Sequence, residues 1–152
     1  MDAIELLKAD HDIVDGLFRE VEASGAGEHA ELFVQIKAEL EAHAHVEETI
    51  FYPSLQEDGD ETLVELVSEA LKEHAQAKVV LGELAAVTSD TDKFEPLLMK
   101  LIEDVRHHVE EEEGTMFPTV EAQFEVEVLR RWGGQMQAEK ENFEASAESA
   151  HA

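Results

Sequence analysis

The sequence predicts an all-α fold, an antiparallel up-down four-helix bundle followed by a shorter C-terminal fifth helix. Apolar residues recur at helical spacing between sparse glycines and prolines. No segment alternates apolar and polar residues with β-branched enrichment, so strands are not expected. Four long helical segments joined by short turns are typical of an antiparallel bundle.

The first two helices are expected over residues 4–23 and 28–56. In the first helix, Ile4, Leu7 and His11 share one stripe. The glycine-containing segment 24–27 should end it, because glycine is favoured just beyond a helix. Pro53 lies inside the second helix and should kink it or thin its last turn.

The next two helices are expected over residues 61–87 and 94–120, separated by a polar break at residues 88–92. Pro96 is tolerable in a first helical turn, and Pro118 lies near a helix end. A fifth helix should cover about residues 122–145 and fray into a polar tail. We expect one domain over residues 1–152, with the bundle at about 4–120.

Composition and charge exclude several classes of function. The chain has 152 residues, and 37 acidic against 11 basic residues give a formal charge of −26, which repels nucleic acid and anionic membranes. A hydrophobic content of 43% argues against disorder, and the lack of cysteine excludes thiolate metal sites. No apolar run approaches the roughly 18 residues of a membrane span. With no signal-like start, a soluble cytoplasmic protein is expected.

The sequence contains an internal repeat, in which residues 40–55 match residues 105–120. Both copies carry a histidine, a glutamate four residues on, a second glutamate, an aromatic residue and a proline. Residues 7–11 similarly match residues 70–74, and each of these segments ends in a histidine. The chain therefore reads as two related helical hairpins with one inward-facing histidine on each helix.

The repeated histidines and glutamates have the spacing of metal ligands. Residues four apart share a helix face, so His43 with Glu47, and His108 with Glu112, can each present an imidazole and a carboxylate together. Carboxylates can bridge two cations, and imidazole suits iron, zinc and copper. The competing reading is a hydrogen-bonded core, but burying four histidines and two carboxylates without compensating charge is very costly.

At these residues the sequence resembles the hemerythrin-like family of His-His-Glu cation-binding domains, over about residues 4–136. The resemblance implies two iron ions in a four-helix bundle, bridged by two glutamates and an oxo or hydroxo group. The implied ligands are His11, His43, Glu47, His74, His108 and Glu112. Oxygen-carrying hemerythrins have a further histidine where this chain has Lys78, so one iron should lack a protein ligand.

Several neighbours of the site carry open alternatives. Tyr52, a shifted Glu48 or solvent could complete the second metal, although core packing is the favoured interpretation for Tyr52, whose counterpart in the repeat is Phe117. Asp15 and Lys78 either pair beside the site or are both solvated. The apolar wall is expected from Ile50, Phe51, Thr115 and Met116, with Val14, Phe18 and Trp132 further out.

The remaining histidines are assigned away from the site. His45 and His107 lie off the ligand face by helical angle, so both should be surface residues. His29 and His151 are given no role.

The expected function is to bind, sense or reduce a small oxidant, namely dioxygen, hydrogen peroxide or nitric oxide, with catalase- or peroxidase-like activity as one form. Iron storage of ferritin type and a metal-gated sensor acting on a partner in trans are the alternatives. Ferritin-type sites typically draw on Glu-x-x-His elements, which are absent at these histidines. The same ligands would accept manganese or zinc, and the chain is expected to be a monomer or weak homodimer.

Overall fold

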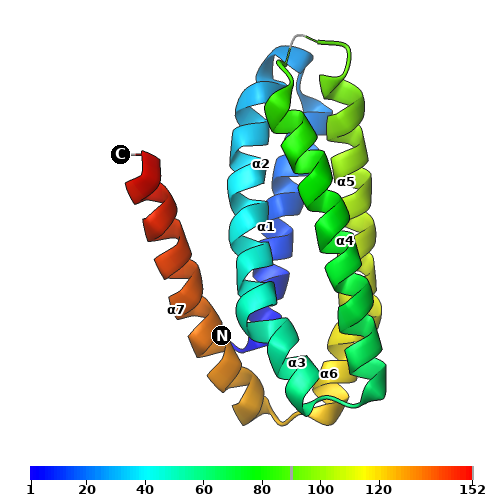
Figure 1. The fold of residues 1–152 in the computed structure, drawn as a ribbon, viewed down its shortest axis with the longest axis vertical. Helices are drawn as coiled ribbons and strands as arrows, with labels where there is room; N and C mark the ends of the chain where they lie inside the picture. The colour runs from blue at the N-terminus through cyan, green and yellow to red at the C-terminus, as the bar shows by residue number, and fades with distance from the viewer. Residues whose placement is uncertain (90, 152) are drawn as a thin grey trace.

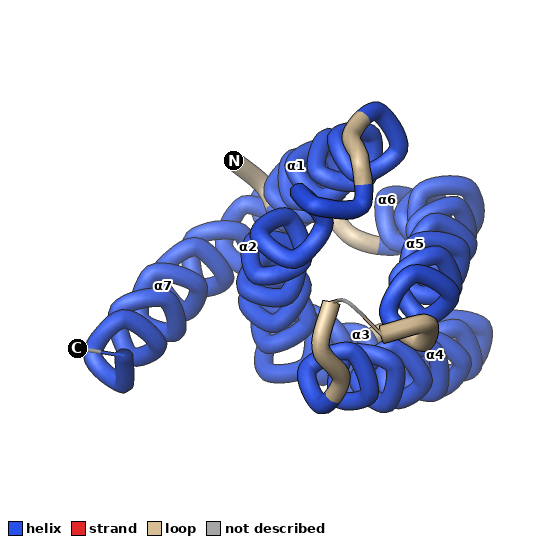
Figure 2. Tube along the Cα trace, turned by 90° about the horizontal axis from the view of Figure 1, so that it is seen from above, coloured by secondary structure: helices blue, strands red, loops and turns tan. Residues whose placement is uncertain are grey.

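The computed structural model describes residues 1–89 and 91–151, with side chains as far as residue 147, and its regular structure is helical (Figure 1). Four long helices, α1 (Ala3–Ala23), α2 (Ala26–Val46), α4 (Glu61–Ala86) and α5 (Phe94–Glu111), surround a common axis when the bundle is viewed from above (Figure 2). The predicted all-α four-helix bundle is confirmed. In the predicted break at 88–92, Asp90 lies outside the described residues, as does the side chain of His151.

Two short π-helical segments interrupt the second and fourth predicted helices. They are η1 (Glu47–Phe51) and η2 (Glu112–Met116), and they lead into α3 (Tyr52–Asp58) and α6 (Phe117–Gln123). Pro53 and Pro118 follow in the first turn of α3 and α6. Proline has no N–H and its ring crowds the preceding turn, so a wider turn relieves the clash. The kink predicted at Pro53 therefore takes the form of a π segment just before it.

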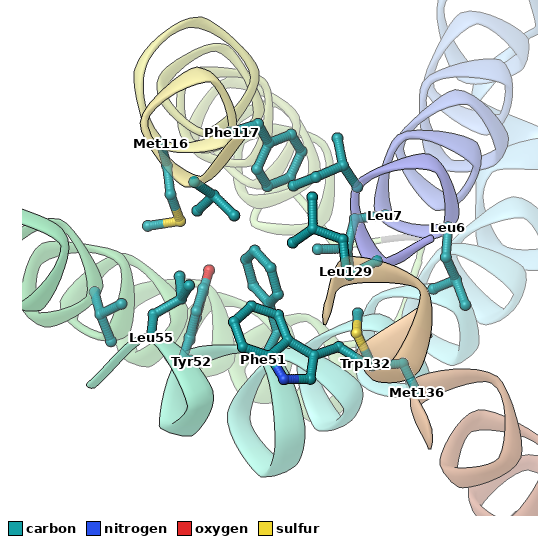
Figure 3. Packing of buried hydrophobic residues seen from close by; sticks show 14 of the residues in the cluster. Leu6, Leu7, Phe51, Tyr52, Leu55, Met116, Phe117, Leu129, Trp132 and Met136 are labelled. Atoms are coloured by element: carbon teal, nitrogen blue, oxygen red, sulfur yellow. The ribbon is translucent and has the colours of Figure 1, made fainter. Parts of the chain in front are cut away.

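One apolar cluster, the basal cluster, fills the end of the bundle where α3, α6 and the start of α7 meet. Its aromatic centre consists of Phe51, Phe117 and Trp132, which pack edge to face at ring distances of 6.0 and 6.5 Å from Phe51 (Figure 3). Leu7 and Leu55 are completely buried beside them.

A second apolar cluster, the distal cluster, fills the opposite end, where α1 joins α2 and α4 approaches α5. It contains Val14, Phe18, Ile36, Leu84 and Leu98. On α1 and α4, residues of one cluster give way to residues of the other about midway. Helices α2 and α5 contribute to the distal cluster, and the chain reaches the basal cluster at the end of α2 and in the segments after α5. The two clusters therefore enclose a layer between them, and the predicted ligand histidines lie in that layer.

Helix α7 (Val126–His151) begins and ends later than the predicted fifth helix. Its first turns pack against the bundle through Leu129, Trp132 and Met136, and the helix then diverges from α1 and α2 (Figure 1). Gly133 permits the approach, because a Cβ there would overlap the backbone oxygen of Met1. None of the described helices is long and apolar enough to cross a membrane. The cytoplasmic location stays a prediction.

His29, to which the sequence assigns no role, is a buried connector at the distal end. Its Nε2 lies 2.9 Å from the backbone oxygen of Val21, and its Nδ1 lies 2.8 Å from a carboxylate oxygen of Glu95. The side chain thus ties the start of α2 to the end of α1 and the start of α5. Burial opposes the charged imidazole, but the hydrogen bond and the negative charge of Glu95 raise the pKa of His29 overall.

The His29–Glu95 pair makes part of the free energy of unfolding dependent on pH. Because the folded-state pKa of His29 is raised, its contribution is fully present below about pH 6.5 and is lost as pH rises through the folded value. We expect His29→Gln to cost about 1 kcal/mol at pH 6, since Glu95 is partly exposed, and clearly less at pH 9. Urea unfolding of the unmodified protein and of His29→Gln, at both pH values and with metal present, measures this difference in stability. An equal cost at both pH values, or an equal effect of His107→Gln, would contradict it.

Candidate metal centre

The six predicted ligands lie together in the layer between the two apolar clusters. They form two buried groups, and in each group one ligand atom per residue lies within 4.8 Å of the others. The first group is His11, His43 and Glu112, and the second is Glu47, His74 and His108. The two carboxylates are the most deeply buried members, Glu47 at 0% and Glu112 at 1% exposure.

Each buried carboxylate contacts imidazoles of both groups. Oε1 of Glu47 lies 3.1 Å from Nε2 of His74, in its own group, and 3.0 Å from Nε2 of His43, in the other. Oε1 of Glu112 lies 3.1 Å from Nε2 of His11 and 3.4 Å from Nε2 of His108. Both carboxylates are therefore placed between the two groups of histidines.

The outward nitrogen of every site histidine faces a further carboxylate, which none of the sequence patterns identified. The four Nδ1 contacts are His11–Glu113 at 2.6 Å, His43–Asp10 at 3.0 Å, His74–Glu48 at 2.8 Å and His108–Glu73 at 2.8 Å. Such partners fix the ring orientation and the tautomer, which leaves each Nε2 to face inward. The repeat held the signal, because these acids either precede a site histidine or are the second glutamate of the repeated pair.

Two lysines balance two of these outer carboxylates. Lys140 of α7 lies 2.6 Å from Oδ1 of Asp10, and Lys78 lies 2.7 Å from Oε1 of Glu48. Burial works against the charge of Asp10, but His43 and Lys140 lower its pKa overall. Helix α7 thus braces the site through Lys140.

The suggested pairing of Asp15 with Lys78 is wrong. Asp15 lies 2.9 Å from Arg19 and 3.5 Å from Arg106. Lys78 is held by Glu48 instead, so the shifted Glu48 that could have completed a metal is engaged on the outer side of His74.

The negative charge of the two buried carboxylates calls for positive charge nearby, which cations could supply. Burial disfavours a protonated His43, but the charge of Glu47 and the hydrogen bond to Asp10 raise its pKa to about 10. Hydrogen bonds to Glu112 and Glu47 raise the pKa of His108 to about 12 against the same burial. Protons thus supply the positive charge that two buried carboxylates require.

Two buried polar atoms also indicate that the site is suited to a metal ion. Within the part of the chain that the structure describes, Nε2 of His43 and Oε2 of Glu47 are the buried side-chain atoms without a hydrogen-bond partner. The 3.0 Å contact of Nε2 of His43 with Oε1 of Glu47 does not have hydrogen-bond geometry. Unsatisfied buried polar atoms are uncommon, and an absent ion is one explanation for them. Imidazole nitrogen and carboxylate oxygen are suitable donors for iron, zinc or manganese.

The π segments bring two aromatic residues onto the ligand face. In a π turn the residue five positions on returns to the same face, so Tyr52 follows Glu47 and Phe117 follows Glu112. The ring of Phe117 stacks on His11 at 5.9 Å. The hydroxyl of Tyr52 donates to Oε2 of Glu112 at 2.5 Å and lies 3.3 Å from Nε2 of His74.

The same change of register alters the expected apolar wall. Thr115 is exposed, so its predicted place against the cluster is wrong. Phe51 and Met116 are buried in the basal cluster, and Ile50 is only partly buried beside it. The prediction assumed α-helical turns after the glutamates, whereas the wider turns shift the inward positions by one residue.

The off-face histidines lie outside both buried groups. The side chain of His107 is 64% exposed and belongs to an outer group with Glu73 and Glu111. His45 is half-buried beneath α7, where it lies 2.8 Å from Glu139 and stacks on Phe143 at 4.5 Å. The surface assignment holds for His107 and only in part for His45, because the path of α7 was not predictable.

Comparison with known proteins places this arrangement among relatives. A family model described as the hemerythrin HHE cation binding domain matches residues 2–120. A relative from Nostoc sp., named DNA nickase, is 27% identical over 148 residues, which make up 95% of this chain and 40% of that protein. The chain therefore spans less than half the length of that relative. A crystal structure of a hemerythrin HHE cation binding domain-containing protein from Mycobacterium kansasii is 26% identical, with a TM-score of 0.83 over 97% of this chain and 90% of that chain.

Proposed function

Because the chain belongs to the hemerythrin HHE cation binding domain family, we propose that it holds a pair of iron ions and uses them to bind and reduce a small oxidant, foremost hydrogen peroxide. The proposed ligands are His11, His43, Glu47, His74, His108 and Glu112, with an oxo or hydroxo group as a further bridge. The observation that carries the proposal is the sharing of each buried carboxylate between both groups of histidines.

Iron would supply redox chemistry, since two adjacent ions can together deliver the two electrons that reduce a peroxide. The protein's own contribution is to fix the ligands and to surround them largely with apolar side chains. Four outer carboxylates orient the imidazoles, and apolar clusters close the layer from both ends. Such a setting favours small neutral oxidants over bulk water.

Tyr52 provides a proton beside the second group of ligands. Burial and the charges of Glu47 and Glu112 raise the pKa of Tyr52 well above its usual value, so the phenol keeps its proton. Its oxygen lies 3.3 Å from Nε2 of His74 and 3.4 Å from Nε2 of His108. The hydroxyl donates to Oε2 of Glu112 in this structure. We assign it the role of turning to donate instead to an oxidant at this place, where Lys78 supplies no ligand because it is turned toward Glu48.

The activity prediction follows from the position of Lys78. We expect the iron-loaded protein to consume hydrogen peroxide, and its reduced form to oxidise rapidly in air rather than persist as an oxygenated form. Lys78→His should lengthen the life of an oxygenated form, because it adds an imidazole one turn beyond His74. Stopped-flow absorption and peroxide consumption measure both effects.

The matched control is Lys78→Gln, which removes the ion pair with Glu48 without adding a ligand. A stable, reversible oxygenated form of the unmodified protein, with no peroxide consumption above that of free iron, would contradict the proposal. Iron held beyond two ions per chain would instead favour storage.

We propose no nucleic-acid partner. The name DNA nickase belongs to a relative of which this chain spans 40%. The formal charge of −26 repels phosphates, which supports the proposal. Incubation with supercoiled plasmid and magnesium should leave the plasmid intact, and nicking that His43→Ala abolishes would overturn this part.

A further inference from the structure

A cavity of about 420 Å³ opens between α2 and α4 and reaches the site. Its inner end is formed by all four site histidines. Beyond them the walls are apolar, and the principal wall residues are Leu40, Ala44, Ala77, Leu81, Val105 and Val109. Ala44 on α2 and Ala77 on α4 are short side chains, which leaves room between the two helices.

The cavity is larger than the proposed small oxidants require. A water molecule occupies about 30 Å³ in the liquid, and dioxygen or hydrogen peroxide has only two heavy atoms. Sites for drug-sized molecules have volumes of about 300–1,000 Å³. Even with a metal pair at the inner end, 420 Å³ leaves space for an apolar group of several carbon atoms.

Among the described residues that line the cavity, both lysines are already paired with acids. Lys37 lies 3.0 Å from Glu41, and Lys78 lies 2.7 Å from Glu48. Asp104 adds a further acid to the lining. Since the chain as a whole is strongly acidic, an anionic ligand would be repelled, whereas a neutral apolar molecule would be attracted by the walls.

We propose that this cavity binds a neutral molecule with an alkyl or aryl body and a single hydroperoxyl or hydroxyl group, of the class of organic hydroperoxides and their alcohols. The body lies against Leu40, Ala77 and Val109, and the polar group faces the histidines. The hydroperoxide as substrate rests on the proposed function, whereas binding of the alcohol depends only on the cavity. The substrate class thereby extends beyond hydrogen peroxide.

Calorimetric titration of the metal-loaded protein with 2-phenyl-2-propanol, the alcohol of cumene hydroperoxide, tests the proposal. We expect saturable binding at one site per chain, together with displacement of a bound apolar dye. Glycerol, which has hydroxyl groups but no apolar body, should not bind. No binding of the alcohol, or equal binding of glycerol, would overturn the proposal.

Substitutions that fill the cavity locate the binding. Ala77→Leu and Ala44→Leu should each weaken binding of the alcohol about tenfold or more. Ala75→Leu and Ala38→Leu are matched controls on the same helices, because both alanines are exposed and outside the cavity lining. Equal affinity in Ala77→Leu and Ala75→Leu, both with full metal content and native circular dichroism, would refute the location.

The outcome is separable from that of the proposed function. Alcohol binding without any peroxide consumption would leave the cavity standing and refute the redox role. Peroxide consumption without alcohol binding would refute the proposed role of the cavity and leave the redox role intact.

Discussion

Metal removal should lower the free energy of unfolding by several kcal/mol, the largest effect expected for any single change to this protein. Glu47 and Glu112 are almost completely buried, and without metal only protonated histidines balance them, so that charged groups stay buried at a high desolvation cost. A ligand that binds only the folded state at a thousandfold excess over its Kd adds about 4 kcal/mol. For a chain of this size that corresponds to a melting temperature about 10 °C lower.

Thermal melting of the metal-loaded and the chelator-treated, dialysed protein measures this difference. Restoring the metal should restore the melting temperature, which controls for damage by the chelator. A metal-free protein with the same melting temperature would mean that the core is hydrated or that the metals bind only marginally.

His43→Ala and His108→Ala should each lose most of the bound metal, whereas His45→Ala and His107→Ala should retain it. His43 and His108 direct Nε2 to the buried carboxylates, at 3.0 Å from Glu47 and 3.4 Å from Glu112. The other two histidines lie outside both buried groups. Metal content after purification and dialysis is the measurement.

The comparison within the second hairpin is the more demanding test. His107 also has an acid four residues on, Glu111, at 3.1 Å. If His107→Ala lost the metal and His108→Ala retained it, the ligand register would be wrong by one residue. Loss of metal in both variants would assign the outer group of His107, Glu73 and Glu111 a role in loading the metal.

The four long helices could be predicted because apolar residues recur at helical spacing between sparse glycines and prolines, and the six clustered residues because they repeat at helical spacing. The π segments could not, since an extra residue in one turn depends on how a proline fits against its neighbours in three dimensions. This is why Tyr52 and Phe117, rather than Ile50 and Thr115, reach the ligand face.

The roles of the outer carboxylates and of His29 could not be predicted for a related reason. The partners of these histidines come from other helices, and His29 and Glu95 are 66 residues apart. A polar residue near a turn gives no sign of burial until its distant partner is known. The internal repeat was the one local signal, because Asp10 and Glu73 hold matching places before the site histidines His11 and His74.

Metal analysis together with an optical spectrum of the aerobically purified protein tests whether the chain holds a di-iron pair. We expect two iron ions per chain, one beside each buried group of ligands, and a near-ultraviolet band typical of an oxo-bridged di-ferric pair. Full occupancy by zinc or manganese without that band, or a chain that binds a single ion, would contradict it.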